Sequence, residues 1–285
     1  MTETTTTKDT QRVRAFPPAP KEFDALAASR TDLARHGLPQ RPDPRTQPGP
    51  SALWEQRARR YRGFEHLAPG LVPAEAPTVV ADAGFGLSPL VSCGFELFYA
   101  AAPITIASGT WTVPNLTYNP APGGLPIHFH TFFGLGFLDV HVEMTVDAAR
   151  NVTSAISTTA GQVALPVRPG DTISATLCLQ TDAAGTASFF LANETTSQTL
   201  NFTVATGFPP AHAVNAGVSR GSQVNGLPDP LAGFGVVYFD ELSAFATSGQ
   251  PRFLDGVPTT MVERDGSTLA TPQRLTDFTF KAVHA

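Results

Sequence analysis

The stretch HFHTFFGLGFLDVHVEMTVD, residues 128–147, predicts two β-strands joined by a glycine-containing turn. Successive side chains of a strand point to opposite faces, so alternation separates the titratable side chains of each strand from most of its aliphatic ones. His128, His130 and Phe132 are predicted to share one face of the first strand, and His141 and Glu143 one face of the second. This pair of strands is therefore the expected centre of both the fold and the site.

The composition is that of a globular protein with little charge. Its 285 residues are enough for one large all-β domain or two average domains. Hydrophobic residues make up 42% of the chain, and 20 Phe against 4 Tyr and 2 Trp favour dry aromatic packing. Charged residues make up only 15%, and the net charge of −5 argues against nucleic acid as the main partner.

The charge is unevenly divided along the chain. Residues 1–75 carry 12 Lys and Arg against 9 Asp and Glu, whereas residues 76–285 carry 7 against 15. No Lys or Arg occurs between Arg62 and Arg150, as expected for a series of buried strands. We therefore predict two parts, a mildly basic N-terminal arm over 1–75 and an acidic, β-rich domain over 76–285.

Within the arm, residues 1–21 are rich first in Thr and then in Pro, and we expect them to be disordered. Helices are predicted over 22–36 and 51–62, separated by a Pro-rich linker over 41–50. The second helix carries the arginines Arg57, Arg59, Arg60 and Arg62. They predict either a solvated helix face, the commoner arrangement, or a surface that docks an anionic protein partner.

From residue 73 onward, short runs rich in Val, Ile, Phe and Thr are separated by Gly, Pro, Asn and Asp. This pattern, about a dozen strands without an intervening helix, predicts an all-β fold built as a two-sheet antiparallel β-sandwich. The strands are predicted at 95–100, 104–113, 126–133, 138–147, 152–158, 163–167, 172–181, 186–193, 199–205, 212–218, 234–239 and 242–247.

The two cysteines, Cys93 and Cys178, are too few for a disulfide framework, and their spacing leaves open one bridge or two buried thiols. The N-terminus lacks the apolar segment of a signal peptide, and no window is apolar enough to span a membrane. We expect a soluble cytoplasmic protein, with export by another route left open.

Several motifs recur in a fixed order along the β-rich part. They are SGTWTVPNL (108–116), FFGLGF (132–137), VEMTVDA (142–148), PGDTISATL (169–177), TASFFLANETTSQTLNF (186–202) and LPDPLAGFGVVYF (227–239). Their order and spacing resemble the glutamic peptidase (eqolisin, peptidase G1) family, and residues 259–280 resemble the tail of its bacterial members. The resemblance implies a concanavalin A-like sandwich of two antiparallel sheets that requires no cofactor.

What is known of this family implies peptide hydrolysis in acid by a Gln and a Glu on the concave face of one sheet. The carboxylate acts as general base and the amide stabilises the oxyanion. The resemblance puts Glu143 at the position of the Gln and Ala216 at that of the Glu, and residues 211–219 contain no Glu. Phe132 stands where the family has a Trp, and Glu96 falls in the segment that replaces its opening Asn-Trp-Ser-Gly. The resemblance thus implies a member that has lost its catalytic pair.

The histidines of the same face predict a metal site as an alternative. Imidazoles two residues apart on one strand, opposed by His-x-Glu on the next, can supply ligands to Zn²⁺ or another divalent metal. The candidate ligands are His128, His130, His141 and Glu143, and His212 is expected to face the same cleft because it shares the parity of Ala216. Two further alternatives are hydrogen-bonded histidines that only line a polar cleft, and Glu143 acting as a lone acid or base with Glu96.

These observations leave four functions open. The first is a catalytically inactive sandwich that binds a peptide or a glycan in a groove containing Glu96, Phe132 and His212. The second is a metal-binding protein or metal-dependent hydrolase, and the third is an acid endopeptidase whose catalytic pair lies elsewhere. The fourth is an assembly role, in which the basic arm docks a protein partner and the sandwich is the scaffold.

Overall fold

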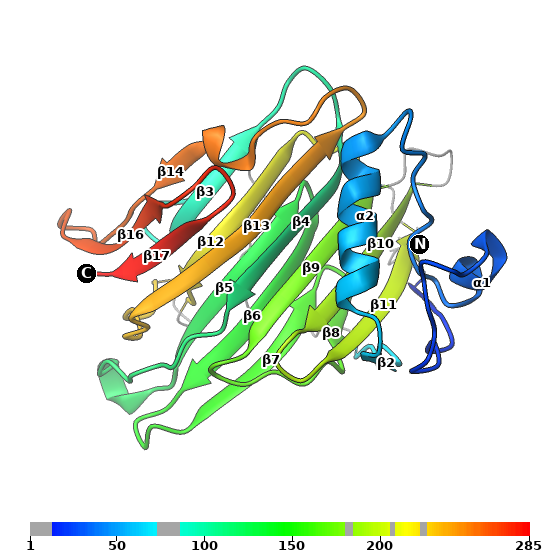
Figure 1. Ribbon diagram of the computed structural model, residues 1–285. Helices are drawn as coiled ribbons and strands as arrows, with labels where there is room; N and C mark the ends of the chain where they lie inside the picture. The colour runs from blue at the N-terminus through cyan, green and yellow to red at the C-terminus, as the bar shows by residue number, and fades with distance from the viewer. Residues whose placement is uncertain (1–12, 73–85, 180–184, 206–208, 223–226) are drawn as a thin grey trace, which may run out of the picture.

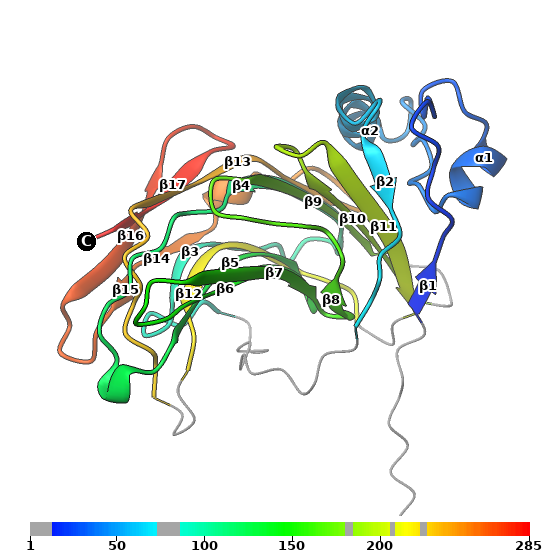
Figure 2. The same ribbon diagram turned by 90° about the horizontal axis from the view of Figure 1, so that it is seen from below.

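Two stacked β-sheets form the body of the protein, as the computed structural model shows (Figures 1 and 2). The structure describes residues 13–72, 86–179, 185–205, 209–222 and 227–285. Within these residues every strand pairing but one is antiparallel. The predicted all-β, two-sheet sandwich is confirmed.

The first sheet has seven strands in the described residues, in the order β14-β3-β12-β5-β6-β7-β8. Their bounds are β3 (Ser92–Phe98), β5 (Ile127–Leu135), β6 (Leu138–Val146), β7 (Val152–Thr158), β8 (Gly161–Val163), β12 (Ala213–Arg220) and β14 (Val257–Thr259). β5 and β6 form the hairpin predicted from the sequence, paired from Ile127 with Val146 to Leu135 with Leu138. The chain reverses between them at Gly136, whose φ of +58° causes little steric strain only in a residue without a side chain.

The second sheet has ten strands in the described residues, along the path β1-β11-β10-β9-β4-β13-β17-β16-β15, with β2 parallel to β11. Their bounds are β1 (Val13–Ala15), β2 (Glu65–Leu67), β4 (Ile104–Thr112), β9 (Thr172–Leu179), β10 (Thr186–Asn193), β11 (Gln198–Ala205), β13 (Val236–Ala246), β15 (Met261–Val262), β16 (Thr268–Arg274) and β17 (Phe280–His284). Two 3₁₀ turns, Pro122–Gly124 and Phe253–Asp255, lie in the connections.

The core lies between the two sheets and follows from strand alternation. In β6 every second residue from Leu138 to Val146 is at most 1% exposed, whereas those between are partly exposed. Trp111 of β4 crosses the core, donates from Nε1 to Thr131 Oγ1 at 2.8 Å and stacks on Phe133. Removing such a buried ring costs about 3–5 kcal/mol of stability. Because turning the hairpin over would expose its buried side chains, the core fixes which face of the hairpin remains outside.

Both cysteines are free thiols. Cys93 lies in the core on β3, whereas Cys178 lies on β9 of the other sheet. Burial raises the pKa of each thiol to about 12, so neither is a reactive thiolate.

The predicted break between 234–239 and 242–247 is a β-bulge within one strand, β13. Its pairing with β4 shifts between Asp240 and Ser243, and Glu241 adopts a φ of +53°. The extra residue lets Phe239 and Leu242 both face the core while Glu241 points outward.

The strands β14–β17 were not predicted. Two of them are very short, and Pro258 of β14 and Pro272 of β16 are residues that weaken a strand assignment.

The N-terminal arm is built into the second sheet. β1 and β2, from residues predicted to precede the sandwich, both pair with β11. The first helix, α1 (Arg30–Arg35), is shorter than predicted, and Ser29 caps it: its Oγ accepts from the amide of Asp32 at 3.1 Å. Of the segment 1–21 expected to be disordered, residues 1–12 lie outside the described residues, and the prediction is wrong for residues 13–15, which form β1.

The second helix, α2 (Pro48–Arg60), lies on the outer face of this sheet (Figures 1 and 2). It begins three residues before the predicted start, because Pro48 and Pro50 suit a first turn where no amide hydrogen is needed. In the described part of the chain no helix has the length and apolar character needed to cross a membrane.

Two arginines of α2 hold the arm on the sheet. Arg57 is only 7% exposed, so the predicted solvated helix face is wrong at this position. Its contacts are Tyr61 Oη at 2.6 Å, Ser108 Oγ at 2.9 Å, Glu241 at 3.4 Å and Glu194 at 3.6 Å. Arg60 pairs with the same two carboxylates, whereas Arg59 stays exposed beside Glu55. The anionic groups that meet this face of α2 are therefore Glu194 and Glu241 of the same chain.

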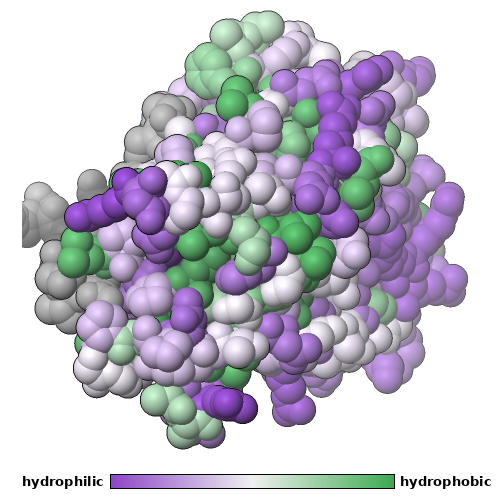
Figure 3. Space-filling model, turned by 90° about the vertical axis from the view of Figure 1, so that its left-hand side faces the viewer, coloured by the Kyte–Doolittle hydropathy of each residue, from purple (hydrophilic) through white to green (hydrophobic). Residues whose placement is uncertain are grey.

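The end of the sandwich at β14 and β16 carries hydrophobic residues among hydrophilic ones (Figure 3). Phe98 of β3 and Val257 of β14 are 62% and 69% exposed. In the described residues β14 is the edge of its sheet, and its three-residue length and Pro258 limit pairing with another strand.

Candidate functional site

The outer face of the seven-stranded sheet is the hollow side of the sandwich, because both sheets bow in the same direction (Figure 2). We call it the concave face; it lies on the opposite side of the molecule from α2. It consists of the residues of β3, β12, β5 and β6 that alternate with core residues. Its central members are Glu96, Asn215, Gly217, His128, His130, Phe132, Gly134, Asp139, His141 and Glu143.

Phe132 occupies the middle of the concave face. It pairs with Gly217 of β12 on one side and with His141 of β6 on the other. A Cβ added at Gly217 would lie 2.9 Å from Cζ of Phe132, so the ring covers this glycine. The concave face therefore has no room for a larger side chain at this point of β12.

An amide and a carboxylate are neighbours at one end of the concave face. Asn215 of β12 is the direct cross-strand partner of Glu96 of β3, a spacing that puts Cβ atoms about 5 Å apart. Glu96 accepts from the amide of Gly86 at 3.1 Å, whereas the Asn215 side chain has no hydrogen-bond partner among the described residues. Asn215 Oδ1 lies over Gly134, where an added Cβ would approach it to 2.6 Å.

A carboxylate–imidazole pair lies beyond Phe132 on β6. Asp139 Oδ2 and His141 Nε2 are 3.1 Å apart, and Thr159 Oγ1 donates to Asp139 at 2.7 Å. Burial would lower the pKa of His141, but the carboxylate of Asp139 outweighs it and the pKa is raised. Burial would raise the pKa of Asp139, yet His141 and Thr159 together lower it. Each group of the pair therefore favours the charged form of the other, while His141 Nδ1 is buried without a partner among the described residues.

His130 is a buried neutral imidazole at 3% exposure. Burial, reinforced by the charges of His141 and His128, lowers its pKa to about 3. Its ring stands perpendicular to that of His141 at a centroid distance of 6.2 Å, and its Nδ1 also lacks a partner in the described chain.

His128 interacts with Asp229 through both its side chain and its backbone. Its Nδ1 lies 2.9 Å from Asp229 Oδ2, and the same oxygen accepts the backbone amide of His128 at 3.0 Å. The hydrogen bond to Asp229 is the main cause that raises the pKa of His128.

Glu143 is a partly exposed carboxylate without a partner. Its cross-strand neighbours are His130 on β5 and Ala155 on β7, and it makes no hydrogen bond or ion pair within the described residues. Its negative charge helps to raise the pKa of His128 and of His141. Glu143 is thus free to accept a hydrogen bond or a proton from a molecule on this face.

The structure does not bring the predicted metal ligands together as a metal site. His128, His130, His141 and Glu143 do share the concave face, but His128 turns to Asp229 and His141 to Asp139. In the described part of the chain no three His, Cys, Asp or Glu side chains are arranged to hold a metal ion.

Two predicted site residues lie elsewhere. Ala216 is fully buried in the core, so it does not share a face with Glu143, and the expected register of β12 is one residue out. His212 precedes β12, with its Nδ1 3.0 Å from the carbonyl oxygen of Tyr99 and its ring 6.3 Å from that of Phe98. Glu96 and Phe132 do lie on the concave face.

Three residues of the site were not predicted: Asp139, Asn215 and Asp229. Asp139 is two residues from His141 on a predicted strand, so alternation alone places the two together. Asn215 requires the correct register of β12. Asp229 comes from a connection whose approach to His128 no sequence pattern indicates.

The fold and its concave face define a β-sandwich of the glutamic peptidase kind. Residues 91–281, more than half of the chain, match the Peptidase A4 family. The chain belongs to this family, that of the glutamic peptidases or eqolisins.

Solved structures agree with this placement. Scytalido-glutamic peptidase with a transition state analog inhibitor is 13% identical, with a TM-score of 0.52 over 69% of this chain and 98% of that chain. SCP-B, a member of the eqolisin family in a complex with the tripeptide Ala-Ile-His, gives the same four values. At this identity the likeness concerns the fold. Comparison with curated protein sequences gives no match.

Proposed function

We propose that this member of the Peptidase A4 family binds an extended peptide on its concave face and does not hydrolyse it by a Gln–Glu pair. The observation that carries the proposal is the set of β12 side chains on this face: Ala213, Asn215, Gly217 and Ser219, none of them a carboxylate. A general base must reach the water that it activates. Glu143, two strands from β12, has no amide side chain as a cross-strand neighbour.

Unpartnered polar groups favour a ligand with a peptide backbone. The Asn215 amide can both donate and accept, and Glu143 can accept. These groups match the alternating N–H and C=O groups of an extended chain. One structure with this fold, that of SCP-B, holds a tripeptide.

A peptide fits this face better than a glycan does. Sugar rings stack on exposed aromatic faces, whereas Phe132, at the centre of this face, is only 7% exposed and its ring is pressed over Gly217. The exposed Phe98 lies at the end of β3, away from this centre. We therefore choose a peptide between the two ligand classes.

A second candidate, peptide hydrolysis by Glu96 and Asn215, is favoured by one observation. These two residues are direct cross-strand partners on the concave face, so a carboxylate base and an oxyanion-stabilising amide stand side by side.

The experiment compares binding with cleavage. The protein is mixed with a pool of peptides from a digested denatured protein, binding is measured by co-elution and cleavage by mass spectrometry, between about pH 2 and 8. We expect peptides to co-elute without new cleavage products. Glu143→Gln should weaken binding, whereas Glu22→Gln, an exposed glutamate in the arm, should not.

Cleavage would overturn the proposal, and the variants then identify its site. Cleavage that Glu96→Gln abolishes would establish the second candidate, whereas cleavage that only Glu143→Gln abolishes would place a different catalytic pair at Glu143. The absence of both binding and cleavage would refute both candidate functions.

A further inference from the structure

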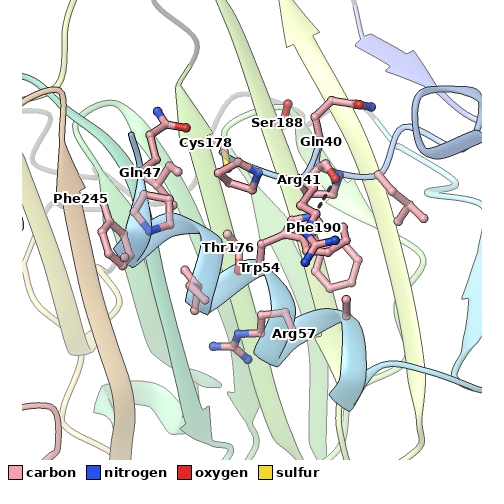
Figure 4. Close-up of a pocket in the computed structure, with 18 of the residues that line it drawn as sticks. Gln40, Arg41, Gln47, Trp54, Arg57, Thr176, Cys178, Ser188, Phe190 and Phe245 are labelled. Carbon is pink, nitrogen blue, oxygen red and sulfur yellow. Dashed lines mark hydrogen bonds between the residues drawn. The ribbon is translucent and has the colours of Figure 1, made fainter. Parts of the chain in front are cut away.

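A cavity lies beneath the N-terminal arm, on the opposite side of the sandwich from the concave face. It has a volume of about 1160 Å³ and lies between the arm and the outer face of the ten-stranded sheet (Figure 4). The sheet contributes Thr176 and Cys178 of β9 and Ser188 and Phe190 of β10. Pockets for small molecules commonly measure about 300–1,000 Å³, so this space is large enough for one such ligand.

Rigid aromatic side chains form much of its wall. Trp54 of α2 is fixed by a hydrogen bond from Nε1 to the carbonyl oxygen of Pro39 at 2.8 Å and lies beside Phe190 (Figure 4). Phe245 of β13 lies toward the other end, near Gln47. Exposed residues such as Gln40 and Gln47 also line the cavity, so it meets solvent along the arm. These flat apolar surfaces favour a ligand with rings or an apolar chain.

The charges deep in the cavity are balanced within the chain. The buried Arg57 lies within 3.6 Å of both Glu194 and Glu241. The exposed Arg41, at the rim, pairs with Glu55. A ligand carboxylate beside Arg57 would therefore meet two carboxylates already in place. The cavity favours a neutral ligand.

We propose that this cavity is a small-molecule binding site for a neutral, mainly apolar compound with flat rings that pack against Trp54, Phe190 and Phe245. The site is separate from the concave face, so the proposal is independent of peptide binding or cleavage there.

Nile red, a neutral aromatic dye with a carbonyl group, is the first probe. Titrated into the full-length protein, it should show a saturable rise in fluorescence at one dye per chain. Ser188→Phe, which places a ring in the cavity from β10, should weaken binding at least tenfold. Ser157→Phe, a partly exposed serine on β7 of the other sheet, is the matched control and should bind as the wild type does.

Hydrogen exchange of the wild-type protein tests the location without any variant. Nile red should slow amide exchange in α2 and β10 and leave β5 and β6 unchanged. Protection of β5 and β6 instead, non-saturable dye binding, or Nile red binding that survives in folded Ser188→Phe would each overturn the site.

Discussion

Both outer faces of the sandwich carry glutamate side chains. On one face they are paired with arginines, whereas on the other a glutamate is unpaired among the described residues. On the face covered by the arm, Glu194 and Glu241 are paired with Arg57 and Arg60. On the concave face, the side chains of Glu143 and Asn215 have no partner among the described residues. The carboxylates on the first face are used to hold the chain together, whereas Glu143 and Asn215 on the second remain available to a ligand.

The difference begins in the backbone. A bulge in β13 adds one residue and gives Glu241 its outward position opposite α2, where it meets arginine. Regular alternation in β6 gives Glu143 its outward position over an open sheet face. The same residue type therefore stabilises the fold in one place and can contact a ligand in the other.

Replacing Arg57 by Leu should have the largest effect on the covered face. It leaves Glu194 and Glu241 with one arginine instead of two and removes the hydrogen bonds to Tyr61 and Ser108. Breaking a buried charge cluster by removing one partner typically costs about 3–5 kcal/mol. The free energy of unfolding, measured by urea denaturation, should fall by this amount.

Arg59→Leu is the control for that measurement. Arg59 is on the same helix but exposed, with one surface pair to Glu55 at 3.3 Å, so the cost should stay below about 1 kcal/mol. Equal losses for the two variants would show that the cluster does not hold the arm on the sheet.

On the concave face, His130 should make the protein sensitive to acid. Its folded pKa of about 3 lies below the ordinary value of 6.5, so between these values the unfolded chain takes up a proton that the folded chain does not. Stability should therefore fall as pH drops from 6.5 toward 3, by up to about 1.4 kcal/mol per pH unit. Such a loss is unfavourable for a peptidase that works in acid.

His130→Leu removes this titration and keeps an apolar side chain of moderate size. Its unfolding free energy, measured against pH, should decline less steeply than that of the wild type below pH 6.5. Parallel curves for the two proteins would show that His130 is protonated in the folded state.

The sequence predicts the centre of the concave face better than its edges. Alternation in β5 and β6 places His130, His141 and Glu143 correctly, because a strand with one buried face leaves no freedom of register. The position of Ala216 is wrong because it came from the resemblance to the family; in β12 itself Val214, Ala216 and Val218 alternate with Asn215, Gly217 and Ser219, a pattern that indicates a buried Ala216. The contact of His128 with Asp229 and that of α2 with the bulge in β13 depend on long-range packing, which no local pattern encodes.

The same substitution on both faces sharpens the comparison. Glu241→Gln removes the charge that Arg57 and Arg60 share and should cost about 1–2 kcal/mol, whereas Glu143→Gln removes no contact and should change stability by less than about 0.5 kcal/mol. Thermal unfolding of the two variants side by side measures the difference. A similar loss in both would mean that Glu143 has a structural partner after all.

The smallest effect is expected at His128, with the opposite pH dependence to His130. Because the hydrogen bond to Asp229 raises the folded pKa of His128 above its ordinary value, the ion pair stabilises the protein below pH 6.5 and this contribution is lost as pH rises through the folded pKa. The imidazole is 46% exposed, so solvent screens the pair and the gain should be a few tenths of a kcal/mol, weaker in high salt. His128→Gln should therefore be slightly less stable than the wild type at pH 5. The two proteins should be equally stable at a pH where His128 of the wild type is neutral in both the folded and the unfolded state. A deficit that stays constant with pH would mean that His128 acts through packing and not through its charge.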